Sequence, residues 1–253
     1  MGLPHTGVEW VMAPDGTRGH SWNYITGCLN GCPYCYARGL ANGRLKTRYL
    51  ANPCLLAGNY SDPFAPRVWP ERLSWPEQRK KPTMIFPCDM GEWCGDWVPE
   101  AEVLAMLHVV MECPQHTFAF LTKQPQCLAR YSPFPRNMWV GVSITNDQQA
   151  EDACYYFEDL FPVDGLLFAS FEPLTEPIAP SLLRRLSRVV GWVIVGGQTK
   201  PRVDPQPETV STIIDHFDPY GIPVFLKDSL EGVVAPWMFE EYRRIPVRVR
   251  GGV

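Results

Sequence analysis

Short apolar runs rich in β-branched and aromatic residues alternate along the chain with segments of helical character. Several runs, such as WVIVGG and GLLFASFEP, are apolar at consecutive positions, as in strands that are covered on both faces. The alternation predicts an α/β fold with a parallel sheet, in the form of a complete or partial (β/α) barrel. The expected strands are His20–Ile25, Thr83–Pro87, Thr117–Thr122, Met138–Ile144, Leu166–Phe171, Trp192–Gly196 and Pro223–Lys227. The expected helices lie near Tyr34–Asn42, Pro99–Met111, Asp147–Asp159, Pro180–Ser187 and Pro207–His216.

Residues 43–82 do not follow this alternation of strands and helices. They are rich in Pro, Trp, Arg and Tyr, and their hydrophobic positions have no sustained period. A segment of this length without regular elements usually has a function in a compact domain. We therefore expect residues 43–82 to be an irregular insertion over the mouth of the barrel. Residues 1–253 as a whole are expected to form a single domain.

The composition is that of an ordinary globular protein, with 45% hydrophobic and 20% charged residues. No apolar run approaches the roughly 18 residues of a membrane helix. The first residues also lack the basic start and apolar stretch of a signal peptide. We therefore expect a cytoplasmic protein that has no membrane partner. The formal net charge of −4 gives no global basic field, so local arginine clusters neither indicate nor exclude a nucleic acid.

Three of the nine cysteines are crowded into the segment TGCLNGCPYCYA, with C-x3-C-x2-C spacing: Cys28, Cys32 and Cys35. In a chain too long to need disulfides, this pattern favours reduced thiols that bind a metal. A zinc site would normally have a fourth Cys or His close by, and the next cysteine is Cys54. Three ligands on a cluster of four irons leave one iron open to a small molecule. A zinc site and three unrelated buried thiols are the alternatives.

Polar side chains follow nearly every expected strand. The carboxyl ends of the strands of a (β/α) barrel meet on one face, where active sites are built. The sequence therefore predicts one cavity lined by these strand ends, although each residue alone could also be a helix cap or a rim hydrogen bond. The residues are Asp89, Glu92, Lys123, Ser143, Asn146, Glu172, Gln198, Lys227 and Asp228.

The cysteine spacing, with Tyr34 just before the third cysteine, resembles the motif of the radical S-adenosylmethionine (SAM) superfamily. The chain also resembles, over nearly its whole length, a phage-associated family of radical-SAM-like proteins. A phage-encoded protein would lie in the host cytoplasm. The pieces that carry this resemblance include TGVEW, FAPRVWPERL, IFPCDMGEWCGDWVP, FAFLTKQP, WVGVSITN, FASFEPL, WVIVGGQTKP and GIPVFLKD.

The superfamily resemblance implies a [4Fe-4S] cluster on the three cysteines and SAM as the second cofactor. It implies that Asp89 and Glu92 meet the SAM ammonium group, that Ser143 holds the ribose and that Tyr34 packs beside the cluster and the adenine. Gly196 and Gly197 are expected to allow close approach of the adenine, because they remove side chains from a strand end. Asn146 and Gln198 are further candidate cofactor or substrate contacts. The family pattern would place an acidic residue at position 198, where this chain has glutamine.

Lys123, Glu172 and Lys227 are the candidates for contact with the substrate, although a Lys–Glu pair could also be a rim ion pair. Cys88 is a candidate hydrogen-atom donor to a product radical, as is Cys94. The alternative for both is a small buried hydrophobic side chain, which free cysteine usually is.

The resemblance implies an enzyme that cleaves SAM reductively and abstracts hydrogen from its substrate with the 5′-deoxyadenosyl radical. A nucleobase or nucleotide is the favoured substrate, modified or isomerised as in phage DNA hypermodification. Aromatic and guanidinium groups in residues 43–82 could stack on bases. An amino acid or peptide substrate and a non-catalytic iron–sulfur sensor or electron carrier are the alternatives. An enzyme of this class implies an external one-electron reductant of flavodoxin or ferredoxin type, and the oligomeric state is left open.

Overall fold

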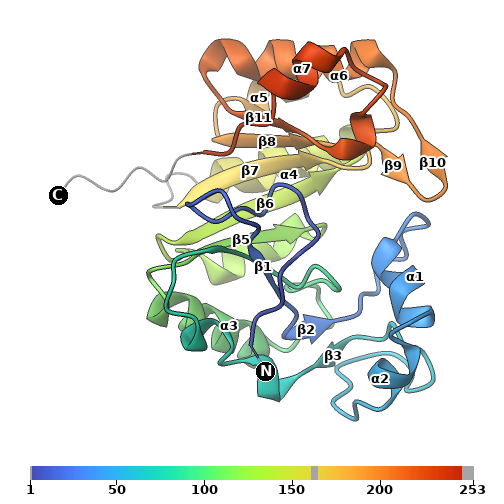
Figure 1. Cartoon of the computed structure of the whole chain (residues 1–253), viewed down its shortest axis with the longest axis vertical. Coiled ribbons are helices and arrows are strands. Elements are labelled where there is room, and N and C mark those ends of the chain that lie inside the picture. Colours follow the sequence, from blue (N-terminus) through green and yellow to red (C-terminus); the bar gives the residue numbers. More distant parts are fainter. Residues whose placement is uncertain (1, 161–164, 247–253) are drawn as a thin grey trace. The chain divides into compact units, whose positions relative to one another are not determined.

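The computed structural model describes residues 2–160 and 165–246 (Figure 1). By its internal contacts the chain divides into two compact units. The first unit is Met1–Val142 with Asp159–Gly165, and the second is Ser143–Glu158 with Leu166–Val253. The single-domain organisation expected from the sequence stays a prediction.

Parallel strands form the core of each unit. In the first unit β1 (His20–Trp22), β4 (Met84–Pro87) and β5 (Thr117–Thr122) pair in this order, and β5 pairs with β6 (Met138–Ile144), whose last two residues belong to the second unit. In the second unit β8 (Trp192–Val195) pairs with both β7 (Leu166–Phe171) and β11 (Val224–Leu226). The seven strands belong to one sheet of order β1-β4-β5-β6-β7-β8-β11, which follows the sequence. The sheet is open, because β1 and β11 stand at the two ends of this order and are not neighbours in it. An open sheet is that of a partial (β/α) barrel, and the predicted fold class is confirmed.

The strands and helices form where burial requires them. The residues of β4, β6 and β8 are buried without exception, which is why these strands read as continuous apolar runs. Helix α3 (Glu100–Glu112) buries Val103, Met106, Leu107 and Val110, the spacing of one helix face. The other helices are α1 (Tyr36–Asn42), α4 (Asp147–Leu160), α5 (Pro180–Leu186), α6 (Pro207–Phe217) and α7 (Pro236–Glu241). The 3-10 turns are Pro70–Arg72, Pro76–Gln78, Pro125–Tyr131, Asp218–Tyr220 and Asp228–Leu230.

The expected first strand is divided by the structure. Its end is a separate strand, β2 (Ile25–Thr26), which pairs antiparallel with β3 (Arg67–Val68) from the irregular segment. Besides β3, residues 43–82 contain one short helix, α2 (Lys46–Leu50), and short turns. Their position over a barrel mouth stays a prediction. A second hairpin, β9 (Gln198–Thr199) with β10 (Arg202–Val203), follows β8.

The irregular backbone of residues 52–65 is organised by the fully buried side chain of Arg67. Its guanidinium donates to the carbonyl oxygens of Asn52, Tyr60, Asp62 and Ala65 at 2.9–3.2 Å. A buried backbone carbonyl needs a donor, and this segment has no sheet or long helix to provide one. The Arg67 side chain therefore supplies the hydrogen-bond donors that a sheet or helix would otherwise supply.

Among the described residues, none of the helices combines the length and apolar character needed to cross a membrane.

Candidate metal centre and cofactor site

The cysteine loop begins at Gly27, directly after β2. Gly27 has φ +84°, and a Cβ at this position would lie 2.4 Å from the carbonyl oxygen of Ala65. Only glycine permits this conformation and this approach. The next residue, Cys28, donates its backbone N–H to Phe64 O at 3.2 Å. The start of the loop is therefore fixed against residues 64–65 of the irregular segment.

The three loop cysteines are free thiols, each half-buried. The backbone N–H of Asn30 donates to Cys28 Sγ and that of Arg38 to Cys35 Sγ, both at 3.3 Å. Burial raises the pKa of Cys28 to about 12, against the opposing effect of the Asn30 N–H. Cys35 is also the N-cap of α1, and Cys28 and Cys35 pack against one apolar cluster that includes Ala37, Ala41 and Tyr49.

These donors fit an iron–sulfur cluster by their chemistry. Thiolates are soft ligands, and N–H groups directed at the sulfur atoms are a feature that sets the potential of such clusters. The geometry is not that of a closed metal cage: within residues 2–160 and 165–246, no group of three or more His, Cys, Asp or Glu side chains is arranged to hold a metal ion. The assignment of Cys28, Cys32 and Cys35 as ligands therefore stays a prediction.

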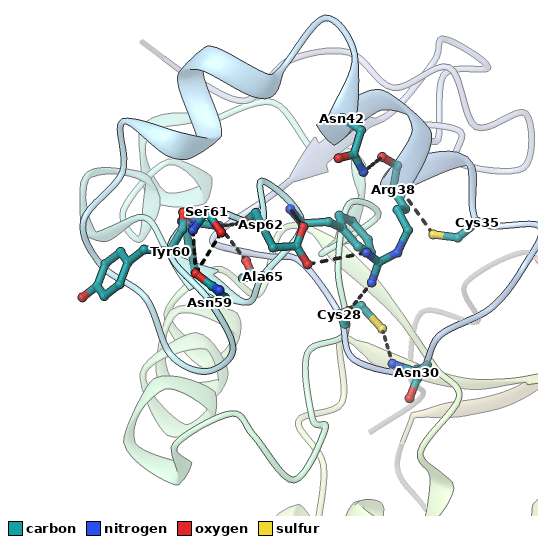
Figure 2. Close-up of polar contacts among 12 residues, drawn as sticks. Cys28, Asn30, Cys35, Arg38, Asn42, Asn59, Tyr60, Ser61, Asp62 and Ala65 are labelled. Carbon is teal, nitrogen blue, oxygen red and sulfur yellow. Dashed lines mark hydrogen bonds and ion pairs between the residues drawn. The ribbon is translucent and has the colours of Figure 1, made fainter.

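Arg38 of α1 ties the cysteine loop to the irregular segment (Figure 2). Its guanidinium lies 3.5 Å from the Asp62 carboxylate and donates to Cys28 O at 3.4 Å. Its Cζ lies 4.9 Å from the centroid of the Phe64 ring. Arg38 was not predicted as a site residue. It lies in the first turn of α1, and its contacts with Cys28 and Asp62 form only in the folded chain.

Glu92 connects the same loop to the ends of β4 and β5. Its buried carboxylate accepts hydrogen bonds from Thr122 Oγ1 (2.7 Å), the backbone N–H groups of Trp93 (3.1 Å) and Lys123 (3.0 Å), and Asn30 Nδ2 (3.4 Å). Burial raises the pKa of Glu92, and the Lys123 N–H opposes this rise. Asn30 lies between two of the candidate ligands, so this carboxylate helps to fix the loop.

The Asp89 carboxylate, like that of Glu92, is surrounded by hydrogen-bond donors, but it has fewer of them. Its carboxylate accepts from Ser21 Oγ at 2.7 Å and from the Asn23 side-chain amide, and burial raises its pKa. The Tyr36 hydroxyl donates to the backbone carbonyl of Asp89 at 2.6 Å. The Asp89 carboxylate is thus held between β1 and the residues that follow it.

Tyr34 and Lys123 also lie in this centre. Lys123 Nζ is 5.5 Å from the centroid of the Tyr34 ring, within the range of a cation–π contact. Gln124, the next residue, donates its side-chain amide to Asn30 Oδ1. The first unit therefore brings together Cys28, Cys35, Tyr34, Asp89, Glu92 and Lys123 of the predicted residues, and adds Ser21, Asn23, Asn30, Thr122 and Gln124, which the sequence analysis missed.

Two cysteines follow β4. Cys88 is buried, has φ +57°, and has its pKa raised by burial. Cys94 is paired with Cys127 in a disulfide, with Cα atoms 6.2 Å apart. This pair differs from the expectation of reduced thiols, because the loop after β4 and the turn Pro125–Tyr131 bring two distant cysteines within bonding range. A disulfide sulfur carries no S–H hydrogen, so Cys94 in this pair has none to donate. For Cys88, the hydrogen-atom donor and the small buried hydrophobic side chain both stay predictions.

In the second unit Glu172 and Lys227 form an ion pair, with side chains 28% and 16% exposed. Gly196 lies beside this pair, since a Cβ there would be 3.0 Å from Lys227 Cδ and 3.4 Å from Glu172 Cδ. Gly197 N donates to Ser229 Oγ at 3.0 Å. The closeness of these two side chains therefore favours glycine at position 196, whether or not adenine binds there.

The remaining predicted residues lie apart from this ion pair in their contacts. Ser143 is buried near the end of β6. Asn146 Oδ1 accepts the backbone N–H of Gln149 at 2.9 Å, the contact of a helix cap before α4. The Gln198 side chain donates to Pro201 O at 2.8 Å across the β9–β10 hairpin. A cofactor role for these three residues stays a prediction.

The fold and sequence both have relatives among known proteins. A profile of the DUF5131 family, described as a protein of unknown function, matches residues 5–236, and the chain belongs to this family. Among curated proteins, none matches the chain significantly.

Solved structures of spore photoproduct lyase resemble the chain in fold. A mutant with bound AdoMet and dinucleoside spore photoproduct gives a TM-score of 0.53 at 12% sequence identity. A complex with dinucleoside spore photoproduct gives 0.50 at 9%, and another mutant gives 0.51 at 12%. Each comparison covers 85% of this chain and 64% of the other, so the chain spans less than two thirds of the length of these enzymes. At this identity the likeness shows a shared partial-barrel fold.

Proposed function

We propose that the protein is a radical SAM enzyme, in which Cys28, Cys32 and Cys35 bind a [4Fe-4S] cluster and leave one iron open for SAM. The observation that carries the proposal is the three-cysteine loop after β2, with backbone N–H groups directed at two of its sulfur atoms. The fold adds support, because it resembles that of an enzyme described with bound AdoMet. When bound, the cluster supplies the electron that cleaves SAM to methionine and the 5′-deoxyadenosyl radical.

The residues of the first unit would hold and orient the cofactors. Asp89 is proposed to meet the SAM ammonium group, and a carboxylate is the natural partner of that cation. Glu92 is proposed for the same group, and its hydrogen bonds with Asn30 and the end of β5 support a role in fixing the cysteine loop. Tyr34 is proposed to pack beside the cluster and the adenine, and Lys123 beside it would face the substrate.

The second unit contains the other predicted residues, and their roles are proposed separately. Ser143 and Asn146 are proposed to hold the ribose region of SAM, and Gly196, Gly197 and Gln198 to border the adenine. The Glu172–Lys227 ion pair is the proposed substrate contact, because it is only partly buried and can exchange one partner for a polar substrate group. Cys88 is kept as a candidate hydrogen-atom donor.

A nucleobase or nucleotide is the proposed substrate class, consistent with a phage-associated DNA-modifying role. The enzymes that share the fold are described in complex with a dinucleoside photoproduct, which favours this class over an amino acid or peptide. A non-catalytic electron carrier or sensor is the weaker alternative, because a carrier has no need of polar side chains at so many strand ends.

The test is anaerobic reconstitution with iron and sulfide, followed by addition of SAM and dithionite and an assay of 5′-deoxyadenosine. Cys28→Ala is expected to lose both the cluster absorption and the product. Cys54→Ala is the matched control, because Cys54 is another half-buried free thiol outside the loop. The absence of 5′-deoxyadenosine from wild-type protein with an intact cluster, also with dinucleoside substrates present, would contradict the proposal.

A further inference from the structure

A cavity of about 450 Å³ lies against the segment that leads into β4, within the first unit. Cavities of this size are typical of small-molecule binding sites. Three basic side chains, one amide and one aromatic ring line it, and we call it the basic cavity. These lining residues are Trp75, Gln78, Arg79, Lys80 and Lys81.

The backbone of this segment is held in place by the residues before β5. His116 is fully buried, and its Nε2 donates to the carbonyl oxygens of Pro76 at 3.2 Å and Arg79 at 3.0 Å. The side-chain amide of Gln115 also donates to Arg79 O, at 3.3 Å. The turn that carries Arg79 to the cavity is therefore formed in the chain itself, which lowers the entropy cost of binding a ligand there.

The positive charge at the basic cavity is largely uncompensated. In the described part of the chain Arg79 and Lys80 form no ion pair, and the buried Nε of Arg79 has no hydrogen-bond partner. Lys80 Nζ donates to the carbonyl oxygen of Glu77 at 3.2 Å. Lys81 pairs with Asp15 at 2.6 Å, but both side chains are exposed, and such pairs are weak. The cavity therefore attracts an anion.

Trp75 narrows the class of anion. It is half-buried, and the Cζ of Arg72 lies 5.6 Å from the centroid of its ring. Aromatic rings next to basic side chains bind nucleotides, because the base stacks on the ring and the phosphate meets the cations. The exposed amide of Gln78 can hydrogen-bond to the edge of a base. An acidic peptide would use the cations without needing the ring.

The basic cavity lies at the other edge of the sheet from the candidate cofactor residues. Residues 75–81 come before β4, whereas Asp89 and Glu92 come after it. Likewise His116 precedes β5 and Lys123 follows it. The two strands are parallel, and the six residues of β5 span on the order of 20 Å. The cavity is therefore a separate site from the one that the cysteine loop belongs to.

We propose that the basic cavity binds a nucleotide, with the base stacked on Trp75 and the phosphate held by Arg79 and Lys80. A free nucleotide and a single-stranded nucleic acid present the same base and phosphate to this site. The step is binding alone, and no bond forms or breaks. The inference does not rest on the proposed function, because none of its residues belongs to the cysteine loop or to the candidate cofactor site.

The test is a fluorescence anisotropy titration of the full chain, with and without reconstituted cluster, using a fluorescein-labelled oligothymidylate. The variant that carries Arg79→Gln and Lys80→Gln is expected to bind at least about tenfold more weakly, because two charged donors to phosphate are lost. The slope of log affinity against log salt should also become shallower by about 1.4, since two fewer phosphates are neutralised. Unchanged affinity of this variant would overturn the proposal.

The aromatic part has its own variants. Trp75→Ala is expected to weaken binding at least about fivefold through the loss of base stacking. Trp75→Phe keeps a ring and should bind within about threefold of wild type, which separates stacking from a loss of folding. Equal weakening by both substitutions, with thermal unfolding unchanged, would contradict a stacking role and overturn the proposal.

The matched controls lie in the second unit. Arg184→Gln with Arg188→Gln removes the same charge from an exposed surface, and Trp237→Ala removes a tryptophan that is 61% exposed. Both are expected to leave the affinity within about twofold of wild type. A loss in the arginine control equal to that of the Arg79 and Lys80 variant would show only nonspecific attraction and would overturn the proposal.

Competition identifies the source of the nucleotide. Displacement of the labelled strand by thymidine monophosphate, and not by inorganic phosphate, supports a site for the free nucleotide. Displacement only by unlabelled oligothymidylate supports a site for a single strand. Equal displacement by inorganic phosphate and thymidine monophosphate, equal displacement by polyglutamate, or no binding to wild type would each overturn the proposal. These measurements need no SAM cleavage, so failure of the proposed function would leave their outcome unchanged.

Discussion

The polar centre around Glu92 in the first unit and the Glu172–Lys227 pair in the second are built in different ways. Glu92 is buried and receives its hydrogen bonds mainly from backbone N–H groups and from Thr122. Glu172 meets the flexible end of one lysine and stays partly exposed. The glycines beside them differ likewise, since Gly27 faces backbone whereas Gly196 faces the side chain of Lys227.

The difference separates a rigid centre from an adaptable one. Backbone donors cannot move without unfolding the loop, so the Glu92 centre fixes geometry, as the binding of a cofactor requires. The long side chain of Lys227 can change rotamer and accept a new partner, as the binding of a substrate requires. If the contrast holds, a substitution in the Glu92 centre costs more stability than the matched substitution beside Glu172 and Lys227.

Glu92→Ala is expected to lower the free energy of unfolding by about 4 kcal/mol, because several buried donors lose their acceptor at once. Urea denaturation of the cluster-free chain measures this loss. Glu172→Ala is the matched control from the adaptable centre and should cost much less. Equal losses for the two variants would remove the distinction between the centres.

Gly27→Ala is expected to cost about 3 kcal/mol, since the added methyl group would meet a backbone carbonyl at a positive φ. Gly196→Ala should cost about 1 kcal/mol or less, because the Lys227 side chain can shift by a few tenths of an ångström. Thermal unfolding of both variants, followed by circular dichroism, gives the comparison. A larger loss for Gly196→Ala would show that the second centre is the more rigid one.

Glu92 should also make stability depend on pH. Burial raises its pKa above the usual 4.5, so the folded chain keeps a proton that the unfolded chain loses as the pH rises above that value. Folding stability therefore falls as the pH rises through this window, by up to about 1.4 kcal/mol per pH unit. Glu92→Gln lacks this dependence, and urea denaturation of the cluster-free chain between mildly acidic and neutral pH compares the two slopes. Identical slopes would contradict the assignment.

Glu172→Gln is expected to change the free energy of unfolding by only about 1 kcal/mol, because the ion pair is partly exposed. If the pair contacts substrate, the same variant should reduce substrate turnover far more than SAM cleavage in the absence of substrate. Chromatographic assay of both products measures this ratio. A parallel loss of the two activities would place Glu172 with the cofactor instead.

Much of the fold could be predicted because its strands are continuous apolar runs such as WVIV in β8. Helix α2 was missed because only Tyr49 of its five residues is buried, which leaves no periodic pattern. The two-residue strands β2 and β3 are too short to leave a pattern at all.

The candidate site shows the same limit. Asp89, Glu92 and Lys123 were found because they follow apolar strands, a signal that the sequence carries locally. Asn30 and Gln124 were missed, since their contact joins two polar loops that are distant in sequence. The Cys94–Cys127 pair was missed for the same reason: only the folded backbone brings the two residues together.

The four carbonyl contacts of Arg67 have a consequence for how the family can vary in length. A deletion inside residues 52–65 would remove one or more acceptors and leave the buried guanidinium partly unsatisfied. Substitutions on the outer surface of this segment leave those carbonyls in place. Natural relatives should therefore keep the segment at constant length whenever they keep Arg67, and lose the arginine and the segment together.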